Sequence, residues 1–132
     1  SKSIREGGTK TMTDEQIEKM LVDSIEHAEE DVRERLLRLA RVEADQVLRA
    51  TAKALDIDGD LLESAERTRI EAAMQALARS REGTDHGAIN AAGLALDATT
   101  AAFAGRRMNR SIARALEGRS ADEIDARLGT GA

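Results

Sequence analysis

Few residue types in this chain are able to do covalent or metal chemistry, and those that are present lie far apart. The sequence has no Cys and only two His, His27 and His86. His27 and Asp31 have the i,i+4 spacing of a metal-ligand pair, but a zinc site needs three or four protein ligands and no others are arranged nearby. We expect both His to be surface residues of helices, with no metal bound.

The acidic stretch Asp56-Ile57-Asp58-Gly59-Asp60 superficially resembles a calcium-binding loop. An EF-hand loop has its Gly at the sixth position, whereas Gly59 is fourth counting from Asp56. We therefore interpret the stretch as a turn that ends a helix. Glycine-rich phosphate loops and nucleophile elbows are also absent, so the sequence predicts no catalytic site and no enzyme.

Basic side chains concentrate near the C-terminal end, where five Arg and one Glu lie between Gly105 and Arg119. Nucleic-acid binding is one interpretation, and it predicts binding that falls steeply with salt. However, Phe103 is the only aromatic residue, and the whole chain carries a net charge of -5. We favour a structural role in which these cations lie near a helix C-terminus and pair with the acidic long helix.

The composition indicates helices. Charged residues make up 34% of the chain and apolar residues 41%, and Ala, Leu, Glu and Arg are abundant. No run of 18 apolar residues is present, so we expect no membrane span. The N-terminus lacks the apolar segment of a signal peptide, and with no Cys the chain fits a cytoplasmic protein.

The element that organises the chain is a helix predicted from Thr13 to about Leu55, a stretch without Pro or Gly. Thr13 and Gln16 form a capping box at its start, and apolar residues then recur at helical spacing. Ser24 stands where an apolar residue would continue this stripe, which predicts a kink or break near Asp23-Ser24. Too few residues follow to surround so long a helix, so its first half should form an exposed arm.

Two further helices are predicted after the acidic turn. One begins at Asp60 or Ser64 and runs to about Arg81; the other runs from about Asp85 to about Met108. Gly93 and Gly105 lie inside the second of these, where close approach of another helix is one reason to tolerate them. The core positions predicted for the bundle are Leu62, Ile70, Leu77, Ile89, Leu96 and Phe103.

The predicted fold class is all-α. The second half of the long helix forms an antiparallel three-helix bundle with the two helices that follow. Asn109 caps a short C-terminal helix that closes one end of the bundle. In domain terms, residues 1–12 are a linker or non-native segment. Residues 13–118 are the helical subdomain, divided into the long helix (13–55) and the bundle helices (56–118), and residues 119–132 are a short turn and tail.

Two stretches resemble the C-terminal helical lid of Hsp70 chaperones. Thr13-Asp-Glu-Gln-Ile-Glu-Lys-Met20, followed by Asp23 and Ala28-Glu-Glu-Asp31, is similar to the entry into that lid. Phe103-Ala-Gly-Arg-Arg-Met108 and the residues up to Glu123 are similar to the end of the HscA branch, which serves iron–sulfur cluster assembly. The resemblance covers about Met12 to Ile124. A lid of the general DnaK type and an autonomous helical interaction module are the alternatives.

The resemblance implies a function in a larger protein. The lid lies over a β-sandwich that grips a client peptide, and it slows peptide release; ATP and Mg act in a separate N-terminal domain. In the HscA branch the client is the iron–sulfur scaffold protein IscU, delivered by the J-domain co-chaperone HscB. The resemblance also implies no cofactor and no ATPase activity in this chain, and no nucleic-acid or membrane partner.

The resemblance also assigns roles to individual residues. Asp45 and Arg49 correspond to a latch that binds loops of the sandwich, where DnaK-type members have a His in place of Arg49; an i,i+4 pair between the two is the simpler interpretation. Ile17, Met20 and Leu21 would pack on the sandwich. Without it they would be uncovered and able to pair with another copy. The family's last sandwich strand should precede Met12, but Ser1 to Thr11 does not have the pattern of a strand.

Overall fold

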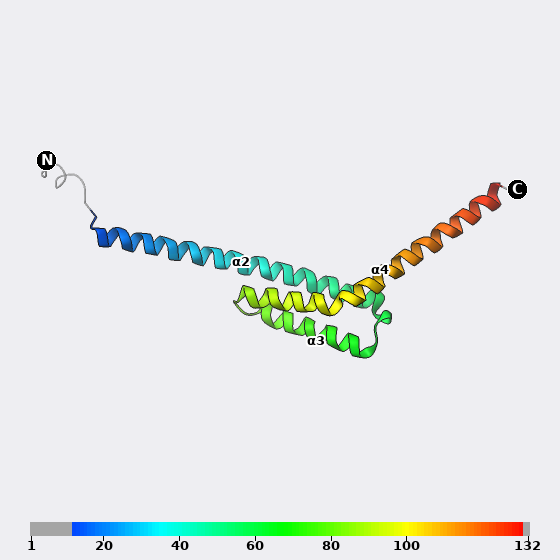
Figure 1. The fold of residues 1–132 in the computed structure, drawn as a ribbon, viewed down its shortest axis with the longest axis horizontal. Coiled ribbons are helices and arrows are strands. Elements are labelled where there is room, and N and C mark those ends of the chain that lie inside the picture. The colour runs from blue at the N-terminus through cyan, green and yellow to red at the C-terminus, as the bar shows by residue number, and fades with distance from the viewer. Residues whose placement is uncertain (1–11, 131–132) are drawn as a thin grey trace. The chain divides into compact units, whose positions relative to one another are not determined.

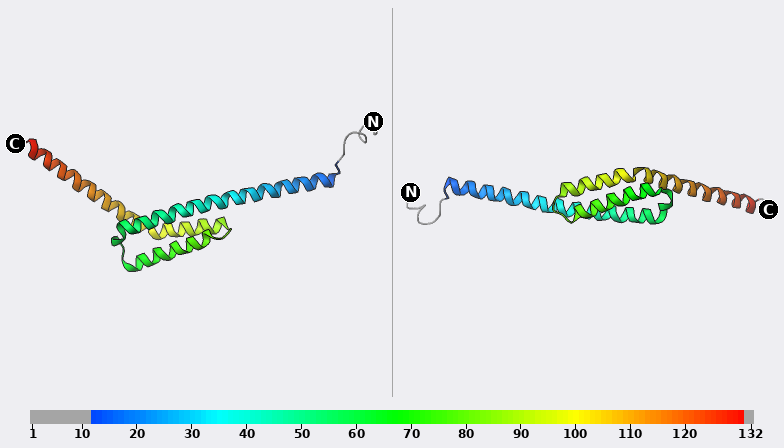
Figure 2. Two further views of the ribbon diagram at one scale, coloured as in Figure 1. Left: turned by 180° about the vertical axis from the view of Figure 1, so that it is seen from behind. Right: turned by 90° about the horizontal axis from the view of Figure 1, so that it is seen from below.

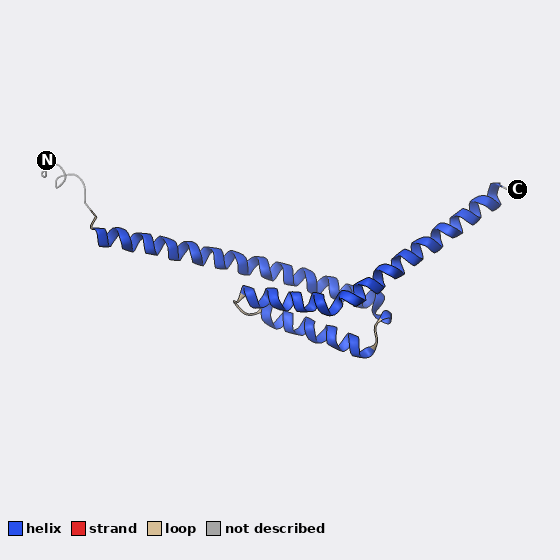
Figure 3. Cartoon of the chain, in the orientation of Figure 1, coloured by secondary structure: helices blue, strands red, loops and turns tan. Residues whose placement is uncertain are grey.

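The computed structural model describes residues 12–130, and these form helices joined by short connections (Figure 1). The elements are α2 (Asp14–Asp58), the 3-10 helix η1 (Gly59–Leu61), α3 (Ser64–Arg81) and α4 (His86–Thr130). No strand occurs among the described residues (Figure 3). The all-α prediction is confirmed, whereas residues 1–11 of the predicted linker lie outside the described part of the chain.

The start of α2 follows the predicted capping box. The Thr13 amide donates to Gln16 Oε1 at 2.8 Å, and the Gln16 amide donates to Thr13 Oγ1 at 3.1 Å. These two bonds satisfy donors that have no partner inside the helix. The helix then continues without a break through Asp23 and Ser24, so the predicted break is wrong. Ser24 is exposed, and an apolar residue missing from an exposed face removes no packing.

The chain divides into two compact units, the first ending at Leu39 and the second beginning at Ala40. The described part of the first unit is the first half of α2. All but one of its larger apolar side chains are exposed, and the exception, Leu37, is half-buried; the exposed ones are Met12, Ile17, Met20, Leu21, Val22, Ile25, Val32, Leu36 and Leu39. This segment therefore has no core of its own.

The second unit contains the core. Ile70 and Leu77 of α3 lie against Ile89, Leu96 and Phe103 of α4, all of them at most 2% exposed. The seven-residue spacing along each helix keeps these side chains on one face, and α3 and α4 run side by side in opposite directions (Figures 1 and 2). The α2 face that joins them is made mostly of small residues, with Ala40, Ala44 and Ala54 buried beside the larger Leu55. Leu62, in the connection before α3, is only half-buried.

Polar groups fix where the next two helices begin. Glu63 and Glu66 form a reciprocal capping box, with the Glu63 amide donating to Glu66 Oε1 at 3.1 Å. Of the two predicted starting points for this helix, Ser64 is therefore correct. Asp85 accepts a hydrogen bond from the Ala88 amide at 3.1 Å and caps α4 in the same way.

The C-terminal part of the chain differs from the prediction. α4 continues to Thr130, so Asn109, Gly118 and Ser120 lie inside one helix and the separate short helix is absent (Figure 2). Close helix approach is also wrong as the reason for Gly93 and Gly105. A Cβ added at either residue would meet nothing within 4 Å. Neither Gly is required by packing within the described residues.

No helix in residues 12–130 combines the length and apolar character needed to cross a membrane.

Candidate functional site

Asp45 of α2, the predicted latch residue, has a partner within the bundle. The Arg81 guanidinium donates from Nε to Asp45 Oδ1 at 2.5 Å and from Nη2 to Oδ2 at 2.9 Å. Arg41 of α2 adds bonds to the carbonyl oxygens of Arg81 at 3.1 Å and Gly83 at 2.8 Å. Together these contacts fasten the end of α3 and the α3–α4 connection to α2.

The Arg81 guanidinium is also the main reason why the pKa of Asp45 is lowered from its usual value, with a smaller contribution from the charge of Arg49. Asp45 thus bonds to Arg81, which is 36 residues away, and not to Arg49 in the simpler i,i+4 arrangement. The side chain of Asp45 remains one-third exposed. Because each carboxylate oxygen accepts more than one hydrogen bond, Asp45 keeps the capacity to bind a further donor.

The Arg cluster forms the second polar site of the bundle. Arg106 binds the Glu66 carboxylate and donates to the Leu61 carbonyl at 2.8 Å. Arg107 donates to Asp58 at 2.8 Å, and its guanidinium lies 5.8 Å from the centre of the Phe103 ring. These contacts join α4 to the end of α2, to η1 and to the first turn of α3.

Arg110 completes this cluster. It donates to Asp58 Oδ1 at 3.1 Å and to both oxygens of Asp60, at 2.8 and 2.5 Å. Asp58, with 9% of its side chain exposed, therefore lies between two guanidinium groups.

These pairs perturb the carboxylates strongly. The hydrogen bond from Arg106 lowers the pKa of Glu66 to about 2. Arg107 lowers the pKa of Asp58, and Arg110 lowers that of Asp60. Four of the five Arg thus form ion pairs inside the chain, three of them with the bundle and Arg119 with Glu123 of α4, which favours the structural interpretation over nucleic-acid binding. Their place is the middle of α4, not a helix C-terminus as predicted.

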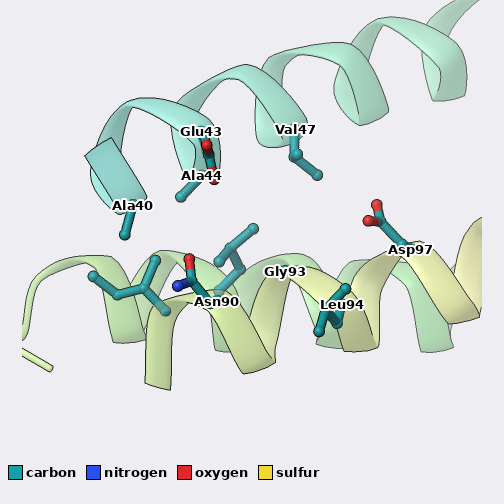
Figure 4. Close-up of a pocket in the computed structure, with 10 residues that line it drawn as sticks. Ala40, Glu43, Ala44, Val47, Asn90, Gly93, Leu94 and Asp97 are labelled. Atoms are coloured by element: carbon teal, nitrogen blue, oxygen red, sulfur yellow. The ribbon is translucent and has the colours of Figure 1, made fainter. Parts of the chain in front are cut away.

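A groove of about 250 Å³ lies between α2 and α4 within the second unit (Figure 4). Its α2 wall is Ala40, Ala44 and Val47, and its α4 wall includes Gly93 and Leu94. Glu43 and Asp97 are the two charged residues that line it. The sequence did not predict this groove. Its signal was the set of small residues at helical spacing on two helices that were both expected in the bundle.

The residues predicted to pack on a β-sandwich lie in the first unit. Ile17, Met20 and Leu21 are 44%, 55% and 59% exposed. Farther along the same segment, Ile25, Ala28 and Val32 line a shallow surface hollow between Glu29 and Arg33. The face is thus apolar and available to a partner.

The two His lie at different places along the helices. His27 is exposed, with Nδ1 2.6 Å from the Asp23 carbonyl oxygen, and that hydrogen bond raises the pKa of His27. His86 is the first residue of α4. Across residues 12–130, no three His, Asp or Glu side chains gather closely enough to hold a metal ion.

Comparison with known proteins places this chain in a family. Residues 1–109 match the family described as Hsp70 protein. A chaperone protein HscA homolog from Burkholderia multivorans is 50% identical over 113 residues, and the HscA of Xenorhabdus nematophila is 48% identical over 113 residues. Each alignment covers 86% of this chain and 18% of the relative, so the chain spans about a fifth of the length of these chaperones. The chain belongs to the Hsp70 family of chaperones and is similar to its HscA members.

Proposed function

We propose that this chain is the helical lid of an HscA-type Hsp70 chaperone. In this role it covers a β-sandwich that holds an extended client peptide, and it slows release of that peptide. The observation that carries the proposal is the identity of about 50% to HscA proteins along most of the chain. The DnaK-type lid remains the alternative, and the names of these relatives favour HscA.

The division of the chain suits this role. The first unit has an apolar face without a core, which is expected of a helix that lies on another structure. The second unit has its own core, and the bond between Arg81 and Asp45 joins the end of α3 to α2. Both features are expected of a rigid lid. Ile17, Met20 and Leu21 would contact the sandwich. Asp45 and Arg49 would bind its loops while Arg81 holds the Asp45 carboxylate in place.

Further parts of the proposal concern the longer protein. ATP and Mg would act in a separate domain, whose nucleotide state opens and closes the lid. The client would be an IscU-like iron–sulfur scaffold protein, presented by an HscB-like J-domain co-chaperone in the cytoplasm. No catalytic step is assigned to the residues of this chain.

The test is the release rate of a fluorescent client peptide from the longer chaperone in its ADP state. Removing the segment that corresponds to residues 13–130 should speed release several-fold without abolishing binding. Unchanged release would contradict the lid role.

The latch is tested separately with two variants. Asp45→Ala should speed release, because it removes the acceptor for the sandwich loops. Arg81→Gln removes the partner of Asp45 inside the bundle but keeps the carboxylate, so release should stay closer to that of the parent protein. Equal effects of the two variants would show that Asp45 acts only by holding the bundle together.

The HscA and DnaK alternatives differ in their clients. An HscA-type chaperone should have its ATPase stimulated by the scaffold protein together with the J-domain partner, and much less by unrelated unfolded proteins. Stimulation by any unfolded protein to the same extent would favour the DnaK alternative.

A further inference from the structure

In the part of α4 from Leu94 to Leu116, one side is bound to the bundle through ion pairs, whereas the residues on the opposite side are uncharged. Arg106, Arg107 and Arg110 point to Glu66, Asp58 and Asp60. At 100° per residue, another set of residues lies on the far side of the helix from Phe103: Leu94, Ala98, Ala101, Gly105, Met108, Ile112 and Leu116. All seven are exposed. We call this set of residues the outer face of α4.

The outer face has the spacing of a helix–helix contact. From Leu94 to Ile112 its members follow one another at intervals of four and three residues, the pattern that keeps a seam turned toward a partner helix. Leu94 is 69% exposed, Met108 65% and Ile112 51%. A chain that is 34% charged has nevertheless kept every charge out of this face.

The pattern is also complementary to itself. Reversing α4 about the midpoint between Ala101 and Gly105 places Leu94 opposite Ile112 and Ala98 opposite Met108. The small residues then meet at the centre and the large ones toward both ends. This arrangement satisfies a two-fold interface, in which the same patch serves both partners.

Gly105 supports the same arrangement. A Gly inside a helix costs roughly 1 kcal/mol relative to Ala, and the structure gives this residue no packing reason within the chain. Beside Ala101 at the centre of the seam, it would let two helix backbones approach closely.

We propose that two copies of this chain associate through antiparallel pairing of their α4 helices along the outer face. Residues 108–116 of each copy then lie beside residues 90–98 of the other, next to the groove between α2 and α4. The last turns of α4 do not fold back to fill this position within one chain, because α4 continues as a single helix to Thr130.

The expected dimer is weak. From Leu94 to Ile112 the face is about 27 Å long at 1.5 Å per residue. Stable interfaces bury roughly 800 Å² per partner, and a single helix face of this length offers less. We therefore expect monomers at low micromolar concentration and dimers near millimolar concentration.

Sedimentation equilibrium of the chain tests the proposal. The mass should rise with concentration from 14.2 kDa toward twice that value. Ala101→Glu places like charges near the two-fold axis and should keep the protein monomeric, while an equal mixture of Ala101→Glu and Ala101→Lys should dimerise again. Ala95→Glu, an exposed Ala on another side of α4, is the matched control and should behave like the unaltered chain.

Disulfide cross-linking tests whether the two paired α4 helices run in opposite directions. Because the chain has no Cys of its own, only the introduced Cys can form a disulfide. Mixed Ala101→Cys and Gly105→Cys variants should form a disulfide between unlike chains faster than between like chains. Faster pairing of like chains would indicate parallel helices and overturn the proposal. A monomer at all concentrations, or a dimer that survives Ala101→Glu through the exposed first half of α2, would overturn it as well.

Discussion

Asp58 joins α2 to α4 at the end of the bundle where α2 ends. It is the last residue of α2, and its nearly buried carboxylate accepts hydrogen bonds from Arg107 and Arg110 of α4. Asp60, two residues later, binds Arg110 as well but is 65% exposed. An ion pair that is exposed to water contributes little to the free energy of unfolding. Removing the charge of a nearly buried carboxylate that lies between two cations lowers that free energy much more.

Asp58→Asn should therefore lower the thermal midpoint of unfolding clearly, because the amide removes the negative charge between the two guanidinium groups and replaces one of their two acceptor oxygens with a donor NH2 group. Asp60→Asn should change the midpoint much less, since water screens that pair. Differential scanning calorimetry of the two variants measures the contrast. Equal shifts would mean that burial of Asp58 does not set the strength of its pairs.

The polar pairs also show which side-chain contacts could be predicted from the sequence. The capping box of Thr13 and Gln16 and the basic stretch of α4 were predictable from the sequence, because each depends on residues close together in the chain. The sequence missed Arg81 as the partner of Asp45, and it did not assign Glu66 to Arg106. Pairs across 36 to 40 residues depend on how the helices pack, which spacing along one helix does not specify.

At the scale of the helices, the seam of α4 was predictable because its period is simple. Ile89, Leu96 and Phe103 recur every seven residues, and burial of one helix face requires such a repeat. The end of α4 was not predictable in the same way. Asn109, Gly118 and Ser120 are ordinary signals for helix ends, but inside a helix even Gly costs only about 1 kcal/mol relative to Ala, against about 3 kcal/mol for Pro, so none of them has to end α4.

Leu96→Ala tests the seam. Leu96 is fully buried, so the substitution should lower the free energy of unfolding by about 2–5 kcal/mol through lost burial and the cavity left behind. Leu39→Ala makes the same chemical change at an exposed helix position and should stay within about 0.5 kcal/mol of the parent. Urea unfolding followed by circular dichroism gives both values; a small loss for Leu96→Ala would contradict the described core.

Gly93→Ala tests the groove wall of α4. An added Cβ meets nothing within 4 Å, so the substitution should stabilise the helix by about 1 kcal/mol. At Gly59 the same Cβ would lie 2.7 Å from Arg67 Nη1, so Gly59→Ala should gain less because that side chain must move. Thermal unfolding of both variants provides the comparison, and a destabilised Gly93→Ala would show that another group comes close to Gly93 in solution.

For the whole molecule, the paired carboxylates predict a loss of stability in acid. The Arg partners lower the pKa of Asp45, Asp58 and Asp60, and that of Glu66 to about 2. The unfolded chain, whose carboxyl groups titrate near pH 4, takes up protons first as the pH falls. The contribution of these carboxylates to the free energy of unfolding should therefore be nearly constant above about pH 5 and decrease from there toward pH 2.

Urea titrations at several pH values measure this decrease. Glu66→Gln should be less stable than the parent at pH 7 and should lose less stability between pH 5 and pH 2, because one of the shifted groups is gone. A slope identical to that of the parent would mean that Glu66 is not held by Arg106 in solution.

The two units also predict how stability is distributed along the chain. Every buried apolar residue in the described part lies at Ala40 or beyond, and an isolated helix is only marginally stable in water. A chain that begins at Glu34 should therefore keep the urea midpoint of the full chain.

In hydrogen exchange, amides of residues 18–36 should exchange through local opening of the helix, whereas those of residues 67–80 should exchange only when the whole bundle unfolds. A lower midpoint in the shortened chain, or equal protection of both segments, would show that the first half of α2 is stabilised by contacts beyond its own hydrogen bonds. The same measurement on the longer chaperone separates the two states of this segment, because a lid that lies on a β-sandwich should gain protection at Ile17, Met20 and Leu21.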